Sequence, residues 1–462
     1  MHIFQLIKFM KLYASSIDTD GVLNISGFPL IGPLGIYLNP HKFFKKWSSK
    51  SSDGWFRFKM QKHLVHVVAG EESRKIFFGT RDFSMQSGYG LGLGIWGDNF
   101  VPASVNHLKP LARIDLIDEL LPLIIPDLER RLDWGVKGKV NAVHILRELP
   151  MAMGVKLSLG DSIGGNHADI DSIIHNIYRL TNTFRPTAKI MPWFPRLSSI
   201  HRIWAGYGLY RIITAARTKR ITQAGTHFEV LQNLVDDKAS VGDCVNAIVA
   251  SIVAIGHNFS NLIVWLYIHL DQDPVWKSKV LSEVHSFIQD HGIARSSNIG
   301  EQLCKITATD WLGSLRSIDL CLEEAARLHG VVALARRNIG GPVGIGDSII
   351  DTGDYVFVSL DDVHFNKHTY PEPSDFDPKR MEGSSTANFL GFGKGLHPCP
   401  GQKLAKIISK IVATLIFYKY EVKMVDKRGK RLHKLPVETK LLHTVALPKD
   451  KLFFSFQKRP TP

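Results

Sequence analysis

Cysteine is scarce in this chain, with only four among 462 residues: Cys244, Cys304, Cys321 and Cys399. Their spacings match neither a disulfide framework nor a metal-binding pair. This scarcity argues against a fold held together by disulfides, and it indicates a reducing compartment.

Flexible linkers, low-complexity blocks and internal repeats are also lacking, although 462 residues exceed the usual length of one domain. We therefore expect a single large domain over residues 21–462. Residues 1–20 contain no apolar run long enough to span a membrane, because Lys8 and Lys11 interrupt it. Polar side chains recur in this segment every three residues, which indicates a helix lying in a membrane surface. A transmembrane anchor whose first part is missing would give the same pattern.

A basic stripe interleaved with aromatic residues, which would indicate nucleic-acid binding, is missing as well. The chain nevertheless carries a net charge of +14, from 57 Lys and Arg against 43 Asp and Glu. We therefore expect no nucleic-acid partner. The excess positive charge suits an anionic membrane surface or an acidic protein partner.

Apolar residues, in contrast, make up 44% of the chain, enough for a large core. Residues 56–60 alternate between apolar and basic side chains, and residues 64–68 are rich in valine, so a strand pair is predicted there. From about residue 70 to 330 the patterns are mostly helical, and the runs 347–360 and 438–457 predict further strands. The expected fold class is mainly α with a small β region.

The segment 245–270 is apolar enough to imitate a transmembrane helix. His257, Asn258, Ser260 and Asn261 lie near its middle, however, where a bilayer would penalise them. We expect instead a long helix that crosses the interior of the protein.

The most specific pattern is FGKGLHPCPG at residues 392–401. A cysteine ligates iron as a thiolate, which nearby donors must stabilise. Gly395 and Gly401 lack the Cβ that would obstruct a close approach of the backbone, and Phe392 would shield the sulfur from water. Residues 402–408 predict a helix whose N-terminus favours an anion at Cys399. The pattern resembles the haem-thiolate loop of the cytochrome P450 family, Phe-x-x-Gly-x-x-x-Cys-x-Gly.

Two further motifs of that family occur in the expected order. Glu324-Ala325-Ala326-Arg327 resembles its Glu-x-x-Arg, a pair that taken alone would usually be solvated. Residues 371–380, PEPSDFDPKR, resemble its Pro-x-x-Phe-x-Pro-x-Arg. The resemblance implies the cytochrome P450 fold, in which Glu324, Arg327 and Arg380 form a buried scaffold that holds the cysteine loop in register.

In most members the long helix carries an acid and an alcohol that relay protons during oxygen activation. Aligned on Gly256, Asn258 replaces the acid and Phe259 the alcohol; aligned on Trp265, His257 replaces the acid and Asn258 the alcohol. We prefer the second alignment, which makes His257 and Asn258 the expected catalytic residues. The alternative is that the two side chains only satisfy each other or a kink in the helix.

The resemblance also implies residues that hold the haem propionates. His397 stands where most members have arginine, and either Arg336 or Arg337 occupies a second such position, of which we prefer Arg337. The family's Trp-x-x-x-Arg motif is not evident, although three residues lie in its region: Trp96, His107 and Arg113. The expected cofactor-binding set, with Cys399 as the metal ligand, is Cys399, Phe392, Gly395, His397, Gly401 and Arg337.

The implied function is a haem-thiolate monooxygenase that contains haem b and inserts one oxygen atom from O2 into an apolar small molecule. NADPH would supply electrons through a flavoprotein reductase at the cytosolic face of the endoplasmic reticulum membrane. The substrate would be a terpenoid, steroid, polyketide or fatty-acyl compound of specialised metabolism. Four apolar residues are expected to contact it: Ile255, Phe259, Val332 and Leu334.

Two alternatives remain open. Loss of the relay alcohol would suit a haem-thiolate isomerase or dehydratase that needs no reductase. Loss of propionate ligands would suit a degenerate haem-binding protein.

Overall fold

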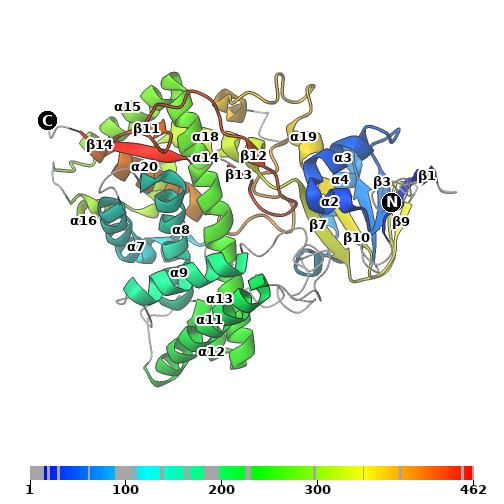
Figure 1. The fold of residues 1–462 in the computed structure, drawn as a ribbon, viewed down its shortest axis with the longest axis horizontal. Coiled ribbons are helices and arrows are strands. Elements are labelled where there is room, and N and C mark those ends of the chain that lie inside the picture. The colour runs from blue at the N-terminus through cyan, green and yellow to red at the C-terminus, as the bar shows by residue number, and fades with distance from the viewer. Residues whose placement is uncertain are drawn as a thin grey trace.

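A computed structural model describes residues 15–17, 21–28, 32–60, 63–88, 108, 112–135, 140–160, 163, 167–181, 197–223, 230–294, 298–346, 348–383, 388–448 and 452–459. Of residues 1–20, where a helix on the membrane surface was predicted, the structure describes only the short strand β1 (Ser15–Ile17). The rest of that segment lies outside the described residues. Figure 1 shows a small lobe built around a sheet and a larger helical lobe.

The small lobe contains a seven-stranded sheet of order β1-β2-β3-β4-β10-β7-β5, which joins both halves of the chain (Figure 1). The predicted strands at 56–60 and 64–68 are present as β3 and β4, and β4 pairs in parallel with β10. Aromatic residues of α3 pack on this sheet, where the rings of Phe44 and Phe357 stack 6.5 Å apart. The elements of this lobe are β1 (Ser15–Ile17), β2 (Leu23–Ile25), α2 (Leu34–Leu38), α3 (Pro40–Ser48), β3 (Phe56–Met60), β4 (His63–Val68), α4 (Glu71–Gly79), β5 (Phe83–Ser84), β7 (Ala333–Asn338), β8 (Val343–Ile345), β9 (Ser348–Ile350), β10 (Tyr355–Ser359) and α19 (Asp361–His364).

The large lobe is mainly helical, which confirms the predicted fold class of helices with a small β region. Small sheets lie at its margin, and β12 and β13 fall in the predicted run 438–457. Its elements are α7 (Ile114–Gly135), β6 (Val140–Asn141), α8 (Ala142–Leu159), α9 (His167–Thr181), α11 (Leu197–Thr222), α12 (Val230–Asp236), α13 (Val241–Ile252), η3 (Val253–His257), α14 (Asn258–Gln272), α15 (Pro274–Asp290), α16 (Gly300–Leu303), α17 (Ala308–Gly313), α18 (Arg316–His329), η4 (Pro378–Met381), α20 (Gln402–Lys419), β11 (Tyr420–Val425), β12 (Glu438–Thr439), β13 (Leu447–Pro448) and β14 (Phe453–Lys458).

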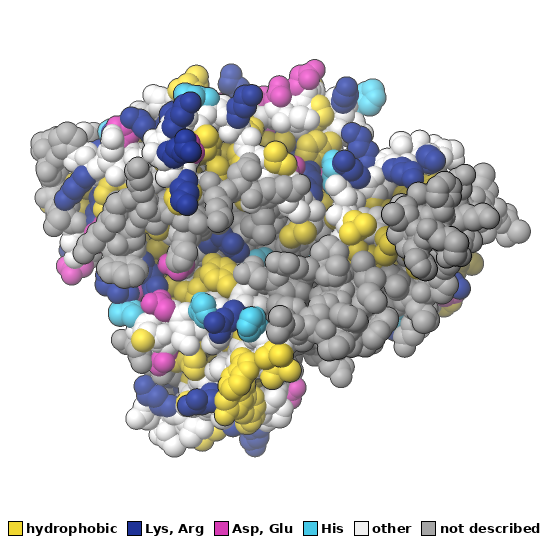
Figure 2. All heavy atoms as spheres, in the orientation of Figure 1, with side chains coloured by type: hydrophobic (Ala, Val, Ile, Leu, Met, Phe, Trp, Pro, Cys, Tyr) yellow, Lys and Arg dark blue, Asp and Glu magenta, His cyan; other side chains and the backbone are white. Residues whose placement is uncertain are grey.

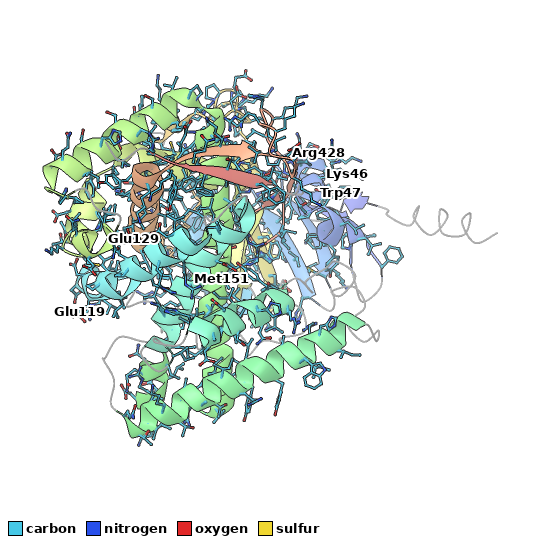
Figure 3. The ribbon with its side chains drawn as sticks, turned by 60° about the vertical axis from the view of Figure 1, so that its left-hand side comes forward. Lys46, Trp47, Glu119, Glu129, Met151 and Arg428 are labelled. Carbon is cyan, nitrogen blue, oxygen red and sulfur yellow. The ribbon has the colours of Figure 1, made fainter. Side chains whose placement is uncertain are left out.

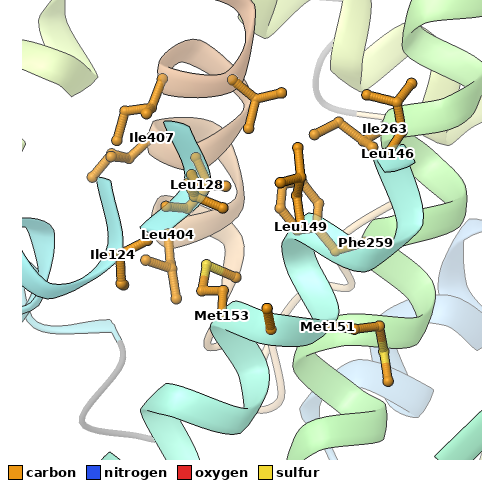
Figure 4. Packing of buried hydrophobic residues seen from close by; sticks show 14 of the residues in the cluster. Ile124, Leu128, Leu146, Leu149, Met151, Met153, Phe259, Ile263, Leu404 and Ile407 are labelled. Atoms are coloured by element: carbon orange, nitrogen blue, oxygen red, sulfur yellow. The ribbon is translucent and has the colours of Figure 1, made fainter. Parts of the chain in front are cut away.

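The helices α13, η3 and α14 form one run, Val241–Gln272, through the centre of the molecule (Figure 1). Its length and apolarity would allow it to cross a membrane, but 67% of its most apolar stretch is buried inside the protein. The prediction of a long interior helix is therefore confirmed. Its central turn, η3, is a π-helix at the point where Gly256 contacts Met151 of α8, which Figures 3 and 4 label. A Cβ on Gly256 would lie 2.4 Å from the sulfur and 3.1 Å from the Cα of Met151, so a larger residue would force Met151 to shift.

Polar side chains join the helices of this lobe at their ends. Glu129 of α7, labelled in Figure 3, accepts hydrogen bonds from the backbone N–H groups of Ile299 and Gly300 at 2.9 and 2.8 Å. The same carboxylate lies 2.6 Å from the ammonium group of Lys419 at the end of α20. Because a buried charge is costly unless it is paired, these contacts fix α7 against α16 and α20.

Four buried histidines should make the stability of the fold depend on pH. Burial lowers the pKa of His257 to about 4 and that of His364 to about 3, and it also lowers the pKa values of His269 and His329. At a pH below about 6.5 but above these folded-state pKa values, the histidines are protonated in the unfolded chain and neutral in the folded protein. Stability should therefore be lost as the pH falls from about 6.5, by about 1.4 kcal/mol per pH unit for each such histidine.

Urea unfolding at pH 7.5, 6.5 and 5.5, chosen to bracket the usual histidine pKa of about 6.5, would measure this loss. The variant His257→Asn should have a weaker pH dependence, whereas replacing the exposed His285 by asparagine should leave it unchanged. An unfolding free energy equal at pH 7.5 and 5.5 would contradict the prediction.

Candidate active site

The loop that carries Cys399 is closed by hydrogen bonds of its own backbone. The N–H of Cys399 donates to the carbonyl of Phe392 at 2.7 Å, and the N–H of Gly393 donates to the carbonyl of Leu390 at 2.9 Å. Gly393 and Gly395 have φ values of +70° and +69°, which L-residues rarely adopt. A tight turn therefore brings Cys399 back beside the residue that opens the motif.

The same loop is fastened to the end of α4 in the small lobe. The N–H of Leu396 donates to the carbonyl of Phe78 at 3.1 Å. A Cβ at Gly395 would lie 2.5 Å from that carbonyl oxygen, so the glycine is required by a backbone contact. The role expected of Gly395 beside the haem stays a prediction, and its contact with the backbone of α4 is a separate reason for a glycine.

Opposing effects act on the Cys399 thiol. The surrounding protein atoms reduce solvation of the thiolate and raise its pKa although part of the residue is exposed, while the backbone N–H groups of Gly401 and Gln402 act to lower the pKa. The helix α20 begins at Gln402, so the sulfur lies at a helix N-terminus, as the pattern predicted. These donors are the groups that a thiolate requires.

Cys399 is the exposed one of the four cysteines. Cys244 and Cys321 are buried, and burial raises the pKa of the half-buried Cys304 to about 11. At Gly401 a Cβ would meet no atom of the described residues within 4 Å, so this side of the turn is open. An exposed cysteine whose thiol meets two N–H donors, in a turn that is open at Gly401, fits an axial thiolate ligand of haem.

Two other residues of the predicted cofactor set belong to the turn that carries Cys399. Phe392 is half-buried against the main core and makes an edge-to-face contact with Phe389 at 5.9 Å. His397 is half-buried, and its carbonyl would lie 3.1 Å from a Cβ on Gly393. Both therefore lie in the same turn as Cys399.

The structure brings Glu324, Arg327 and Arg380 together. Two hydrogen bonds of 2.7 Å join the Arg327 guanidinium to the Glu324 carboxylate, and both side chains are fully buried. Arg380 approaches the same carboxylate at 3.6 Å, and the N–H of Asp377 donates to it at 3.1 Å. The carboxylate therefore ties α18 to the segment around η4.

His364 links this charged cluster to the cysteine loop, a role that the sequence did not suggest. Its carbonyl accepts a hydrogen bond from Arg327 at 2.6 Å, and its Nε2 accepts one from the N–H of Leu390 at 3.1 Å. Leu390 in turn closes the turn at Gly393. An acceptor at Nε2 requires a neutral ring, which agrees with its low pKa of about 3.

The two candidate propionate ligands lie on opposite faces of strand β7. Arg337 lies over the ring of Tyr355 at 5.5 Å and donates to the carbonyl of Gly353. Arg336 is buried and lies over the ring of Phe77, next to the residue that binds the cysteine loop. Alternate residues of a strand point to opposite faces, so Arg336 has the face toward α4, and the choice between the two arginines as propionate ligand stays a prediction.

The expected catalytic residues lie on different sides of the long helix. His257 is buried near Arg147 of α8, and its Nδ1 has no hydrogen-bond partner in the described part of the chain. Asn258 is half-buried and accepts a hydrogen bond from the N–H of Val445 at 3.1 Å. The two side chains thus have different surroundings, and the catalytic roles expected of them stay predictions.

Two further residues of α14 hold the same distant segment as Asn258. Asn261 donates to the carbonyl of Val445 at 3.3 Å, and the indole of Trp265 donates to the carbonyl of Ala446 at 2.9 Å. The spacing of these three residues places them on one face of the helix. That face is therefore fixed to residues 445–446.

Three of the four residues expected to contact substrate are buried in the core. Val332 is fully buried, Leu334 packs with the aromatic residues of α4, and Phe259 lies beside Leu149 of α8 (Figure 4). Only Ile255 is half-buried, and Ala254 beside it is exposed. The three residues are apolar and buried, and their contact with a substrate stays a prediction.

The region of the missing Trp-x-x-x-Arg motif is only partly described. Trp96 and His107 lie outside the described residues. Arg113 is exposed and pairs with Asp115.

Known proteins can now be compared with this geometry. The profile of the family described as Cytochrome P450 matches residues 132–450. The chain is 26% identical over 431 residues to cytochrome P450 monooxygenase AacuE of Aspergillus aculeatus, covering 87% of this chain and 86% of that protein. It is 24% identical over 398 residues to a sterol 14alpha-demethylase of Mycobacterium tuberculosis, covering 80% and 84% of the two chains.

A solved structure shows the same fold. Retinoic acid-bound cyanobacterial CYP120A1 superposes with a TM-score of 0.73 over 94% of this chain and 99% of that chain, at 19% identity. The family match covers well over half of the chain, including the Cys399 loop and the Glu324 cluster. The chain belongs to the cytochrome P450 family and is a monooxygenase, an oxidoreductase whose family implies haem iron with a thiolate ligand.

Proposed function

We propose that this protein inserts one oxygen atom from O2 into an apolar small molecule of the terpenoid, steroid, polyketide or fatty-acyl type, in specialised metabolism. The observation that carries the proposal is the Cys399 loop, with its exposed cysteine and two N–H donors. Haem b bound through this sulfur supplies the activation of dioxygen. NADPH, through a flavoprotein reductase, supplies the electrons.

The residues around the loop would hold the cofactor in place. Phe392 would limit access of water to the sulfur. The cluster of Glu324, Arg327 and Arg380 would keep the loop in register through His364. His397 and Arg336 would reach the propionates, and support for Arg336 comes from its face of β7.

Asn258 would position another group and would not itself release or take up a proton. A carboxamide has no proton to release near neutral pH, and its oxygen already accepts the Val445 N–H. Its Nδ2 group would hold a water molecule or a polar group of the substrate. The pKa of His257, about 4, leaves its ring neutral at pH 7, so it would not donate a proton there.

An acidic reductase would dock beside the Cys399 loop. Lys394 and Lys403 are exposed there, and Lys406, which pairs with Glu323 at 2.6 Å, lies on the same helix as Lys403. Together with the net charge of +14, this supports attraction of an acidic partner. The proposed location is the cytosolic face of the endoplasmic reticulum membrane.

The purified protein, reduced and exposed to carbon monoxide, should show a Soret band shifted far to the red. Turnover of an apolar substrate should then require both NADPH and reductase. Turnover of a peroxide without NADPH would favour the isomerase or dehydratase, as the absent relay alcohol allows. A protein that binds no haem, or shows the spectrum of histidine ligation, would favour the degenerate haem-binding protein.

A further inference from the structure

The long run Val241–Gln272 has an open side near its middle, and one polar residue lies there. Charged side chains are spread over the described part of the outer surface, where one more amide would carry no information (Figure 2). The run, however, crosses the centre of the molecule (Figure 1). Between residues 251 and 271 its residues that are not buried are Val253, Ala254, Ile255 and Asn258. Asn258 is therefore a single amide beside three apolar residues.

The backbone of Val445 and Ala446 lies against the same helix, and all four of its polar groups are hydrogen-bonded. The N–H of Val445 donates to Oδ1 of Asn258 at 3.1 Å, and its carbonyl accepts from Nδ2 of Asn261 at 3.3 Å. The carbonyl of Ala446 accepts from the indole of Trp265 at 2.9 Å, and its N–H donates to the last carbonyl of α18 at 2.8 Å. Residues 445–446 are thus a fixed support for three side chains of α14.

This support determines how the amide of Asn258 is turned. A backbone N–H can only donate, so the atom of Asn258 that meets Val445 must be the amide oxygen and not the nitrogen. Nδ2 is thereby turned away from Val445, and no described residue accepts a hydrogen bond from it. Asn258 therefore offers a donor, and no free acceptor, to the open side of the helix.

A fixed donor among apolar side chains selects ligands that bring an acceptor, because a donor left unpaired on binding costs free energy. The residues beside Asn258 on the open side are apolar, so the rest of the ligand must be apolar too. We propose that the substrate is an apolar skeleton that already carries an acceptor oxygen, such as a carbonyl, and that this oxygen binds Nδ2 of Asn258. In the same proposal Asn261 and Trp265 are positioning residues that act through residues 445–446. The proposal rests on the apolar substrate site proposed above.

Equilibrium dialysis of the holoenzyme with trans-decalin and trans-decalone, two apolar probes that differ by one carbonyl, tests this recognition. The measured quantity is the ratio of the dissociation constant of the ketone to that of the hydrocarbon. Asn258→Leu should raise this ratio about five- to tenfold, because it removes the donor and keeps a side chain of similar size. The matched control Asn233→Leu alters a half-buried asparagine of α12 and should leave the ratio unchanged.

Asn258→Asp distinguishes a donor from a merely polar side chain. Its carboxylate still accepts the N–H of Val445, but a second acceptor replaces Nδ2. At about pH 8, where a carboxyl group is ionised, the ketone should lose affinity and trans-decalol, whose hydroxyl can donate, should become the preferred probe. A role in folding alone would not reverse the preference between the two probes.

Trp265→Phe tests the support. It keeps a ring that can stack on His329, 3.7 Å away in the wild type, but it removes the indole N–H that holds the carbonyl of Ala446. The ratio of ketone to hydrocarbon dissociation constants should rise, by less than in Asn258→Leu. Trp276→Phe, which alters a buried tryptophan of α15, should not change it.

The contrary outcomes are distinct. An equal ratio in the wild type and Asn258→Leu would overturn the inference, and so would an unchanged preference between ketone and alcohol in Asn258→Asp. A wild-type ratio in Trp265→Phe would refute its positioning role. Dialysis measures binding and not turnover, so failure of NADPH-dependent turnover beside an intact effect of Asn258→Leu would refute the proposed activity and support the recognition.

Discussion

Replacement of Cys399 by serine is expected to abolish the red-shifted carbon monoxide band and to reduce turnover below detection. The hydroxyl has nearly the same size as the thiol but does not ionise near neutral pH, so the N–H groups of Gly401 and Gln402 would have no thiolate to stabilise. The loop itself should persist, because its hydrogen bonds join backbone atoms. The free energy of unfolding of the haem-free protein should therefore change by no more than about 0.5 kcal/mol.

Two measurements on a pair of cysteine variants test this expectation. The difference spectrum and the urea unfolding curve of Cys399→Ser should be compared with those of Cys304→Ser, which alters a half-buried thiol elsewhere. Cys304→Ser should keep the spectrum of the wild type. A red-shifted band that survives in Cys399→Ser would assign the axial ligand to another residue.

The replacement of Glu324 by glutamine should produce the largest loss of stability. The carboxylate is fully buried and accepts hydrogen bonds from Arg327 and from the N–H of Asp377, with Arg380 at 3.6 Å. Burial raises the pKa of Glu324, and the charge of Arg327 opposes that rise. Removing the negative charge would leave the Arg327 guanidinium buried without a counter-ion, which costs about 3–5 kcal/mol.

Haem content should fall together with stability in this variant. Arg327 holds the carbonyl of His364, whose ring holds Leu390 at the start of the cysteine loop. Urea unfolding and the ratio of haem to protein would measure the two effects. Glu71→Gln, which removes an exposed carboxylate near Lys75, is the matched control and should change neither. Wild-type stability in Glu324→Gln would contradict the scaffold role.

Local sequence patterns predicted the parts of the site that depend on neighbouring residues. The Cys399 loop closes through contacts within residues 390–402, so its glycines, its phenylalanine and the following helix could be recognised together. The polar residues within an apolar run likewise distinguished the long interior helix from a membrane span. Glu324 and Arg327 are one helical turn apart, and the family motif supplied their distant partner.

Contacts between remote segments account for what the sequence did not reveal. His364 is 26 residues from Leu390 and 37 from Arg327, and no local pattern distinguishes it from any other histidine. Asn258 was expected to work beside His257, yet its partner is Val445, 187 residues away. A periodic pattern shows that a residue is apolar or polar, but not which neighbour its face will meet.

The sequence alone therefore determined the chemistry of the Cys399 loop and the existence of the cluster of Glu324, Arg327 and Arg380, because short motifs specify both. The tertiary structure decided the direction of each side chain. On β7 a shift of one residue exchanges the two faces, so Arg336 rather than Arg337 lies toward α4. Phe259 and Leu334 are apolar wherever they point, and only the packing of α8 and α4 turns them into the core.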